Sequence, residues 1–210
     1  MTLLRIDASI QGPHSASSEL ADLVVAAWST EHPSRPVVQR HLGGEPLPSD
    51  AWAAAVGAAY LPEDQHTGAQ RAARKLAADL AQELRDADHV VLAAPLYNFG
   101  VSQHIKIWMD LAIAGGQPSE RLLDGKPVVL LTTRGGSYAA GTPREGWDHN
   151  TAYLRRILAD VWGADLTVVE REFTLVGINP ALDDFKEIAA VMKKDAHEHA
   201  TAAGTTLATR

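Results

Sequence analysis

The stretch HVVLAAPLYNFG, residues 89–100, decides the fold class of this chain. Its first half, His89 to Ala94, is an apolar run bounded by a charge before it and by Pro95 after it. Such a run predicts a strand that is buried on both faces, as in a parallel sheet covered by helices. The second half is a loop in which two aromatic side chains flank an amide, and Ser102 follows as a cap for the next helix.

The loop Pro95 to Gly100 allows two interpretations. Tyr97, Asn98 and Phe99 together suit a planar ligand that forms hydrogen bonds, and Gly100 lets a backbone come close to it. Alternatively, the aromatic side chains only close the end of a core while Asn98 makes a turn, because strand-to-helix loops often carry such residues without binding anything. This loop alone does not separate the two.

Hydrophobic periodicity predicts strands alternating with helices along the rest of the chain. Strands are expected at residues 3–8, 35–42, 89–94, 128–132 and 166–173, and helices at residues 17–30, 51–60, 67–86, 102–115, 153–162 and 180–199. Thr67 with Gln70 predicts a capping box, and Asn179 before Pro180 predicts the start of the last helix. The tail from Thr201 is expected to be frayed.

This alternation, with central strands that are apolar throughout, predicts an α/β fold. We expect a doubly wound five-stranded parallel sheet with helices on both faces. No linker or internal repeat divides residues 1–210, so they are expected to form one domain. Right-handed crossovers leave few topologies, and the expected strand order is 2-1-3-4-5.

Composition narrows the choice of partners. The formal charge of -7 argues against nucleic acid or an anionic membrane as the main partner, and the absence of cysteine excludes disulfides and thiolate chemistry. No apolar run approaches the roughly 20 residues of a membrane span, and no signal peptide is recognisable, so a cytoplasmic protein is expected. His197 and His199 fall on different helix faces, and no metal site is predicted.

Three loops are expected at one edge of this sheet. The carboxyl ends of parallel strands emerge together, and ligands bind there, where the strand order reverses. The loops at that edge contain Ser9 with Ser15-Ala16-Ser17 after the first strand, residues 95–100 after the third, and Thr133-Arg134-Gly135-Gly136 after the fourth.

The first of these loops predicts a phosphate site. The hydroxyls of Ser9, Ser15 and Ser17 lie beside the free amides at the positive end of a helix. Alternatively, Ser15 or Ser17 is only a helix cap. The loop lacks the glycine-rich fingerprints of dinucleotide folds and nucleotide triphosphatases. The phosphate of a mononucleotide is therefore the remaining candidate ligand.

The loop after the fourth strand could approach a flat ring. Gly135 and Gly136 permit close backbone approach, and their amides could donate to ring atoms. The alternative is an ordinary turn with Arg134 in solvent. A phosphate site, an aromatic loop and a glycine loop on one edge together predict a phosphorylated flavin.

At these residues the sequence resembles the FMN-dependent azoreductases, which are flavodoxin-like NAD(P)H:quinone oxidoreductases. The resemblance covers nearly the whole chain. It implies that Ser9 and residues 15–17 hold the FMN phosphate and that residues 96–99 and 133–136 surround the isoalloxazine. The expected cofactor-binding residues are Ser9, Ser15, Ala16, Ser17, Pro95, Leu96, Tyr97, Asn98, Phe99, Gly100, Thr133, Arg134, Gly135 and Gly136.

The resemblance implies a redox enzyme in which tightly bound FMN supplies the chemistry and no side chain is catalytic. We expect a ping-pong cycle in which NADH or NADPH gives hydride to flavin N5 and a quinone or azo compound then takes two electrons. Amides around Asn98, Phe99, Gly135 and Gly136 would stabilise the anionic reduced flavin.

His14, His104 and Tyr138 are expected to be surface or packing residues, since solvent could protonate the product. The resemblance also implies a homodimer with FMN at the subunit interface.

The sequence departs from the family pattern at three places. Thr133 replaces a common serine, Leu96 replaces a frequent methionine, and the segment Gln117 to Asp124 is shorter and lacks an aromatic residue. In the family that segment helps to shape the substrate cavity, so the sequence does not determine which electron acceptor the protein prefers. The alternatives are a flavodoxin-like electron carrier, a regulatory flavin-binding module, or a relative specialised to one biosynthetic quinone or imine.

Overall fold

The computed structural model describes residues 1–210 and contains the predicted five-stranded parallel sheet. The strands are β1 (Leu3–Asp7), β2 (Val37–His41), β3 (His89–Pro95), β4 (Pro127–Thr133) and β5 (Asp165–Arg171). Their order is β2-β1-β3-β4-β5, which confirms the predicted topology. All neighbours pair in parallel, so every strand ends at the same edge.

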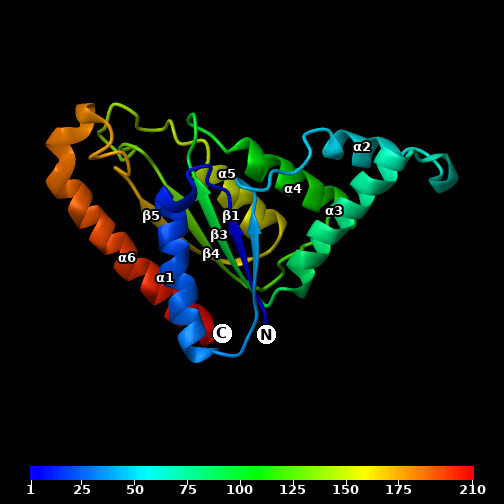
Figure 1. Ribbon diagram of the computed structural model, residues 1–210, viewed down its shortest axis with the longest axis horizontal. Coiled ribbons are helices and arrows are strands. Elements are labelled where there is room, and N and C mark those ends of the chain that lie inside the picture. The colour runs from blue at the N-terminus through cyan, green and yellow to red at the C-terminus, as the bar shows by residue number, and fades with distance from the viewer.

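Helices cover both faces of the sheet, with α1 and α6 on one side and α3 and α4 on the other (Figure 1). The helices are α1 (Ala16–Glu31), α2 (Ala51–Ala58), α3 (Gly68–Asp86), α4 (Gln103–Gly115), α5 (Thr151–Arg155, continued by a π-helical segment, Arg156–Val161) and α6 (Lys186–Ala208). None of them is both long and apolar enough to cross a membrane.

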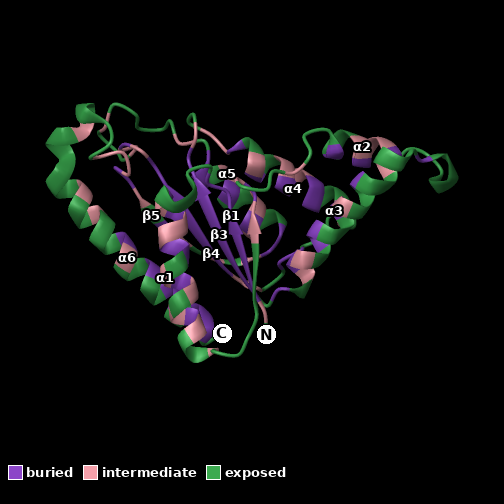
Figure 2. Ribbon diagram, viewed as in Figure 1, coloured by how far each residue is buried: buried purple, intermediate pink, exposed green.

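The central strand β3 is buried along its whole length, because successive side chains serve opposite cores (Figure 2). Val90 and Leu92 belong to the core beneath α3 and α4, while Val91 and Ala93 belong to the core beneath α1 and α6. An apolar run without alternation is therefore what a strand covered on both faces requires.

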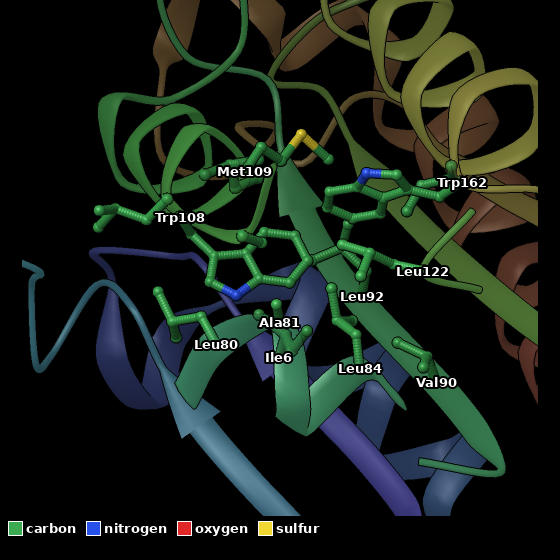
Figure 3. Close-up of a cluster of buried hydrophobic side chains, with 14 of the residues drawn as sticks. Ile6, Leu80, Ala81, Leu84, Val90, Leu92, Trp108, Met109, Leu122 and Trp162 are labelled. Atoms are coloured by element: carbon green, nitrogen blue, oxygen red, sulfur yellow. The ribbon is translucent and has the colours of Figure 1, made fainter. Parts of the chain in front are cut away.

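Two buried tryptophans fill the core beneath α3 and α4 (Figure 3). The ring centroids of Trp108 and Trp162 lie 5.6 Å apart at an interplanar angle of 86°, an edge-to-face arrangement that aromatic pairs favour. Local signals at the helix starts are also confirmed. Thr67 and Gln70 form the capping box of α3, and the Ser102 hydroxyl accepts a hydrogen bond from the amide of Ile105 in α4.

The prediction for the C-terminal tail is wrong. The structure has a 3-10 segment at Pro180–Phe185, and α6 then continues through Ala208. Small residues allow this, because α6 lies so close to α1 that a Cβ at Gly204 would be 2.4 Å from the carbonyl oxygen of Val24. Ala200 and Leu207 are buried in that contact, so the tail is held by packing that its sequence alone does not show.

Candidate functional site

A cavity of about 320 Å³ lies at the carboxyl edge of the sheet, between the loops that follow β1, β3 and β4. The predicted residues that line it are Ser9, Ser15, Ala16, Ser17, Pro95, Leu96, Tyr97, Asn98, Thr133, Gly135 and Gly136. Phe99, Gly100 and Arg134 are not among the lining residues. The structure thus brings all three predicted loops to one pocket.

The first wall of the pocket is the start of α1. The Ser15 hydroxyl caps this helix by accepting from the amide of Ser18 at 3.1 Å, and it lies 3.2 Å from the hydroxyl of Ser17. The amides of Ala16 and Ser17, in the first turn, have no acceptor within the helix. We call this wall, Ser9 with Ser15 to Ser17, the hydroxyl seat.

A buried ion pair lies behind the hydroxyl seat. The Arg5 guanidinium donates to Asp7 at 2.7 Å, and Gln39 donates to the same carboxylate at 3.1 Å. Burial alone would raise the pKa of Asp7, but the hydrogen bonds and charge of Arg5 outweigh it and hold the pKa below its ordinary value. Neither charge lines the pocket, so the seat itself is uncharged.

The loop after β3 is a tight turn attached to the first loop. The Gly100 amide donates to the carbonyl of Tyr97 at 3.0 Å, and Asn98 and Phe99 between them have φ of 49° and 68°. The Tyr97 hydroxyl lies 3.2 Å from Ser9 Oγ and accepts from the amide of Ile10. A positive φ is costly for a bulky residue such as Phe99, so the turn stores strain beside the pocket.

The two glycines after β4, Gly135 and Gly136, differ in how much space a side chain would have. A Cβ at Gly135 would lie 2.6 Å from Leu175 Cδ1, whereas a Cβ at Gly136 would lie 3.6 Å from Arg144 Nη1, an ordinary contact. The Leu175 amide donates to the Gly135 carbonyl at 3.1 Å. The segment after β5 therefore packs on this loop and adds Thr174 and Leu175 to the pocket.

Arg134 is buried, so the alternative that placed it in solvent is wrong. Its guanidinium donates to Asp148 at 2.7 Å, to Glu170 at 2.9 Å and to Thr151 at 3.0 Å. Burial would lower the pKa of Arg134, but these carboxylates raise it above its ordinary value. Glu172, also within 3.4 Å, accepts from the amide of Tyr138, so the Arg134 network positions the loop rather than lining the pocket.

Sequence reasoning did not assign several lining residues, namely Gln11, Tyr138, Arg144, Thr174, Leu175, Asn179 and Leu182. The sequence predicts Tyr138 to be a surface or packing residue and Asn179 to mark the start of the last helix, and neither is predicted to line the pocket. Asn179 does cap the 3-10 segment by accepting from the amide of Ala181 at 3.1 Å. An arginine in a glycine-rich loop after a predicted strand was the available signal for Arg144. His14 and His104 do not line the pocket.

The segment Gln117 to Asp124 does not line this pocket. Arg85 donates to both oxygens of Glu120 at 2.8 Å, and this bidentate pair lowers the pKa of Glu120 to about 2. Leu122 and Leu123 are buried in the core beneath α3 and α4. The segment is thus fastened to the body of the protein, and its effect on acceptor preference stays a prediction.

A doubly wound sheet of order 2-1-3-4-5, with its pocket where the order reverses between β1 and β3, defines the flavodoxin-like class. The flavodoxin-like fold family matches residues 1–199. A protein of Frankia alni named FMN-dependent NADH:quinone oxidoreductase is 39% identical over 191 residues, which are 89% of this chain and 90% of that protein. A protein of the same name from Streptomyces avermitilis is 36% identical over 213 residues, covering 100% and 98%. The chain belongs to this family of FMN-dependent NADH:quinone oxidoreductases, which confirms the resemblance.

Solved structures agree on the fold. Azoreductase AzrA matches with a TM-score of 0.79 at 20% identity, covering 98% of this chain and 100% of that one. An FMN-dependent NADH-azoreductase from Bacillus anthracis, in complex with FMN, matches with a TM-score of 0.71 at 18% identity, covering 97% and 99%. At these identities the likeness establishes the fold alone.

Proposed function

We propose that this protein is an FMN-dependent oxidoreductase that takes two electrons from NADH or NADPH and passes them to a quinone or an aromatic azo compound. The observation that carries the proposal is the pocket itself. In it the hydroxyl seat meets the loops after β3 and β4 at the edge of the sheet where the strand order reverses. The names of the relatives support the same activity.

The hydroxyl seat has the chemistry that an FMN phosphate needs. It offers the hydroxyls of Ser9, Ser15 and Ser17 and the first amides of α1, whose dipole favours an anion. No carboxylate lines the pocket, so nothing there repels a dianion. The residues present therefore fit the phosphate of a mononucleotide.

The loops after β3 and β4 would hold the flavin ring. Bound FMN accepts hydride and returns two electrons, so the protein has to supply position and electrostatics rather than an acid or a nucleophile. Amides near Asn98 and Gly136 would donate to polar ring atoms, and their dipoles would stabilise negative charge on the ring. Tyr97, attached to Ser9, would fix the distance between the phosphate and ring portions of the site.

A homodimer located in the cytoplasm completes the proposal. Exposed apolar side chains on and after α2 support association, with Trp52, Tyr60 and Leu61 exposed by 46%, 83% and 42%. Light scattering on the active protein should give twice the mass of the chain. A fully active monomer would contradict the dimer while leaving the redox activity intact.

The visible spectrum of the purified protein tests the cofactor. A yellow protein that releases FMN on denaturation supports the proposal, and a colourless protein that takes up no added FMN refutes it. Stopped-flow mixing then tests the activity, since NADH or NADPH should bleach the bound flavin and a quinone should restore its colour. Flavin that neither donor reduces would favour an electron carrier or a regulatory flavin-binding module.

A further inference from the structure

Arg144 is the one residue with a formal charge among those that line the pocket. Every other polar group in the lining is a hydroxyl or an amide. Arg144 lies on the loop between β4 and α5, beside Gly136, whereas the hydroxyl seat belongs to the loop after β1. Its charge therefore lies at the part of the pocket formed by the loops after β3 and β4.

Aromatic rings, not carboxylates, surround the Arg144 guanidinium. Its Cζ lies 5.9 Å from the ring centroids of both Phe99 and Tyr138, within range of cation–π attraction. Trp147 packs edge-to-face on Phe99 with centroids 5.5 Å apart. The four residues Phe99, Tyr138, Arg144 and Trp147 form what we call the aromatic rim.

No ion pair neutralises Arg144. The neighbouring carboxylate, Glu145, accepts instead from the amide of Gly141 at 2.7 Å. The structure has no carboxylate oxygen within ion-pair distance of Arg144, although most other arginines of the chain have one. In a protein of formal charge -7, an unpaired guanidinium in the lining of a pocket is a ready anion-binding group.

The loop that carries Arg144 is attached at both ends. The Tyr138 amide donates to Glu172 at 2.7 Å, and the Ser137 hydroxyl donates to the same carboxylate. At the other end, the His149 amide donates to the carbonyl of Phe99 at 3.0 Å. These bonds connect the loop to Glu172, directly after β5, and to the turn after β3, so the backbone that carries Arg144 is anchored on both sides.

We propose that Arg144 is a specificity-determining residue that binds the anionic group of a reactant whose ring enters the pocket. The inference rests on the proposed function and names the chemistry of the reactant, an aromatic or nicotinamide ring bearing an oxyanion. Two sources provide that chemistry, the diphosphate of the reduced nicotinamide donor and an acidic substituent on the acceptor. In a ping-pong cycle both reactants use the same pocket in turn, so one arginine can serve either.

Steady-state kinetics of Arg144→Gln, which removes the charge but keeps a polar side chain, test the proposal. The donors compared are NADH and a neutral dihydronicotinamide that carries a benzyl group in place of the nucleotide. The acceptors compared are a naphthoquinone and its sulfonated counterpart. The matched control is Arg74→Gln, which removes an equal charge from the exposed face of α3, away from the pocket.

We expect kcat/KM to fall about tenfold for at least one anionic reactant, while the neutral reactant of the same pair and the Arg74→Gln protein change less than about twofold. A loss with NADH identifies the donor as the source, and a loss with the sulfonated quinone identifies the acceptor. Added salt should reduce the advantage of the wild-type protein, because it screens exposed charges.

Three results would overturn the proposal. They are unchanged kcat/KM for both anionic reactants, equal losses for charged and neutral reactants, and loss of FMN binding with riboflavin binding preserved, which would place Arg144 on the cofactor phosphate. Failure of the proposed function is distinguishable, because the wild-type protein would then lack FMN or fail to oxidise either donor before any variant is compared.

Discussion

The hydroxyl seat lines the pocket, and the aromatic rim reaches the same pocket through Tyr138 and Arg144. The two regions differ in burial, charge and bonding. Ser15 and Ser17 are 5% and 1% exposed, carry no charge and contact one another. Phe99 and Trp147 are 41% and 50% exposed, and Arg144 beside them has no ion-pair partner. The seat resembles a protein interior, whereas the rim resembles a binding surface.

This difference matches the two tasks of a flavin enzyme that exchanges its substrates. A cofactor that stays bound gains from buried, preorganised donors, since their ordering cost is met when the protein folds. A reactant that enters and leaves in every cycle gains from an exposed charge and aromatic faces, which attract it without enclosing it. Variants on the two sides should therefore fail in different ways.

The two arginines of the loop region give the largest contrast in stability. Arg134→Met should lower the free energy of unfolding by about 3 to 5 kcal/mol, because it leaves the half-buried Asp148 and the buried Glu172 without their cation. Arg144→Gln should change it by less than about 0.5 kcal/mol, because that side chain is exposed and unpaired. Urea denaturation measures both, and similar losses in the two variants would contradict the assignment of Arg134 as a positioning residue.

Removal of two seat hydroxyls should separate phosphate binding from ring binding. Ser15→Ala with Ser17→Ala should weaken FMN affinity about a hundredfold, since each hydroxyl is expected to donate to a charged group. Riboflavin, which lacks the phosphate, should bind the variant as it binds the wild-type protein in a fluorescence titration. His104→Ala is the control that should leave both affinities intact. Unchanged FMN content in the double variant would exclude the hydroxyl seat as the phosphate site.

Substitution by alanine should have a larger effect at Gly135 than at the neighbouring Gly136. Gly135→Ala should cost about 1 to 3 kcal/mol of stability and weaken flavin binding, because its methyl group would overlap Leu175. Gly136→Ala should be tolerated in the free protein, since the nearest atom is 3.6 Å away and belongs to the exposed Arg144. Thermal unfolding and flavin titration of the two variants test this expectation. A larger loss for Gly136→Ala than for Gly135→Ala would contradict it and would mean that Leu175 moves aside.

The smallest expected effect is a pH dependence in the network behind the rim. Burial would raise the pKa of Asp148, but hydrogen bonds from Thr151 and Asn150 and the charge of Arg134 hold it below the ordinary 3.8. Its contribution to stability is therefore complete above pH 3.8 and is lost as the pH falls further, when the unfolded chain takes the proton first. Asp148→Asn should flatten the acid side of the stability profile, and an unchanged profile would contradict the assignment. The hydroxyls of the seat have no corresponding titration.

Much of the fold was predictable because its signals are local. The apolar run His89 to Ala94 predicts a strand covered on both faces from a few consecutive residues, and the caps at Ser15, Thr67 and Ser102 depend on residues within one helical turn. Right-handed crossovers left only a few possible strand orders, and the structure has the one that was expected. The last helix was mispredicted because its end is stabilised by Gly204 against α1, a contact between distant parts of the chain.

The site was predictable in outline for a related reason. Loops that follow parallel strands must meet at one edge, so serines after β1, aromatic residues after β3 and glycines after β4 had to converge. The segment from Thr174 to Leu182 could not be placed in this way. It reaches the pocket only because Leu175 packs on Gly135, a contact that no spacing pattern encodes.

The sequence by itself determined which strands are buried, where the helices begin and which loops share an edge, since each depends on short-range periodicity or on the geometry of any parallel sheet. Only the tertiary structure decided the roles of Arg134 and Arg144, two arginines in the region after β4. Arg134 meets carboxylates from β5 and its continuation and turns inward, whereas Arg144 meets aromatic rings and keeps its charge free. The physical reason is that the energy of a charge depends on what surrounds it in space, and these surroundings come from distant parts of the chain.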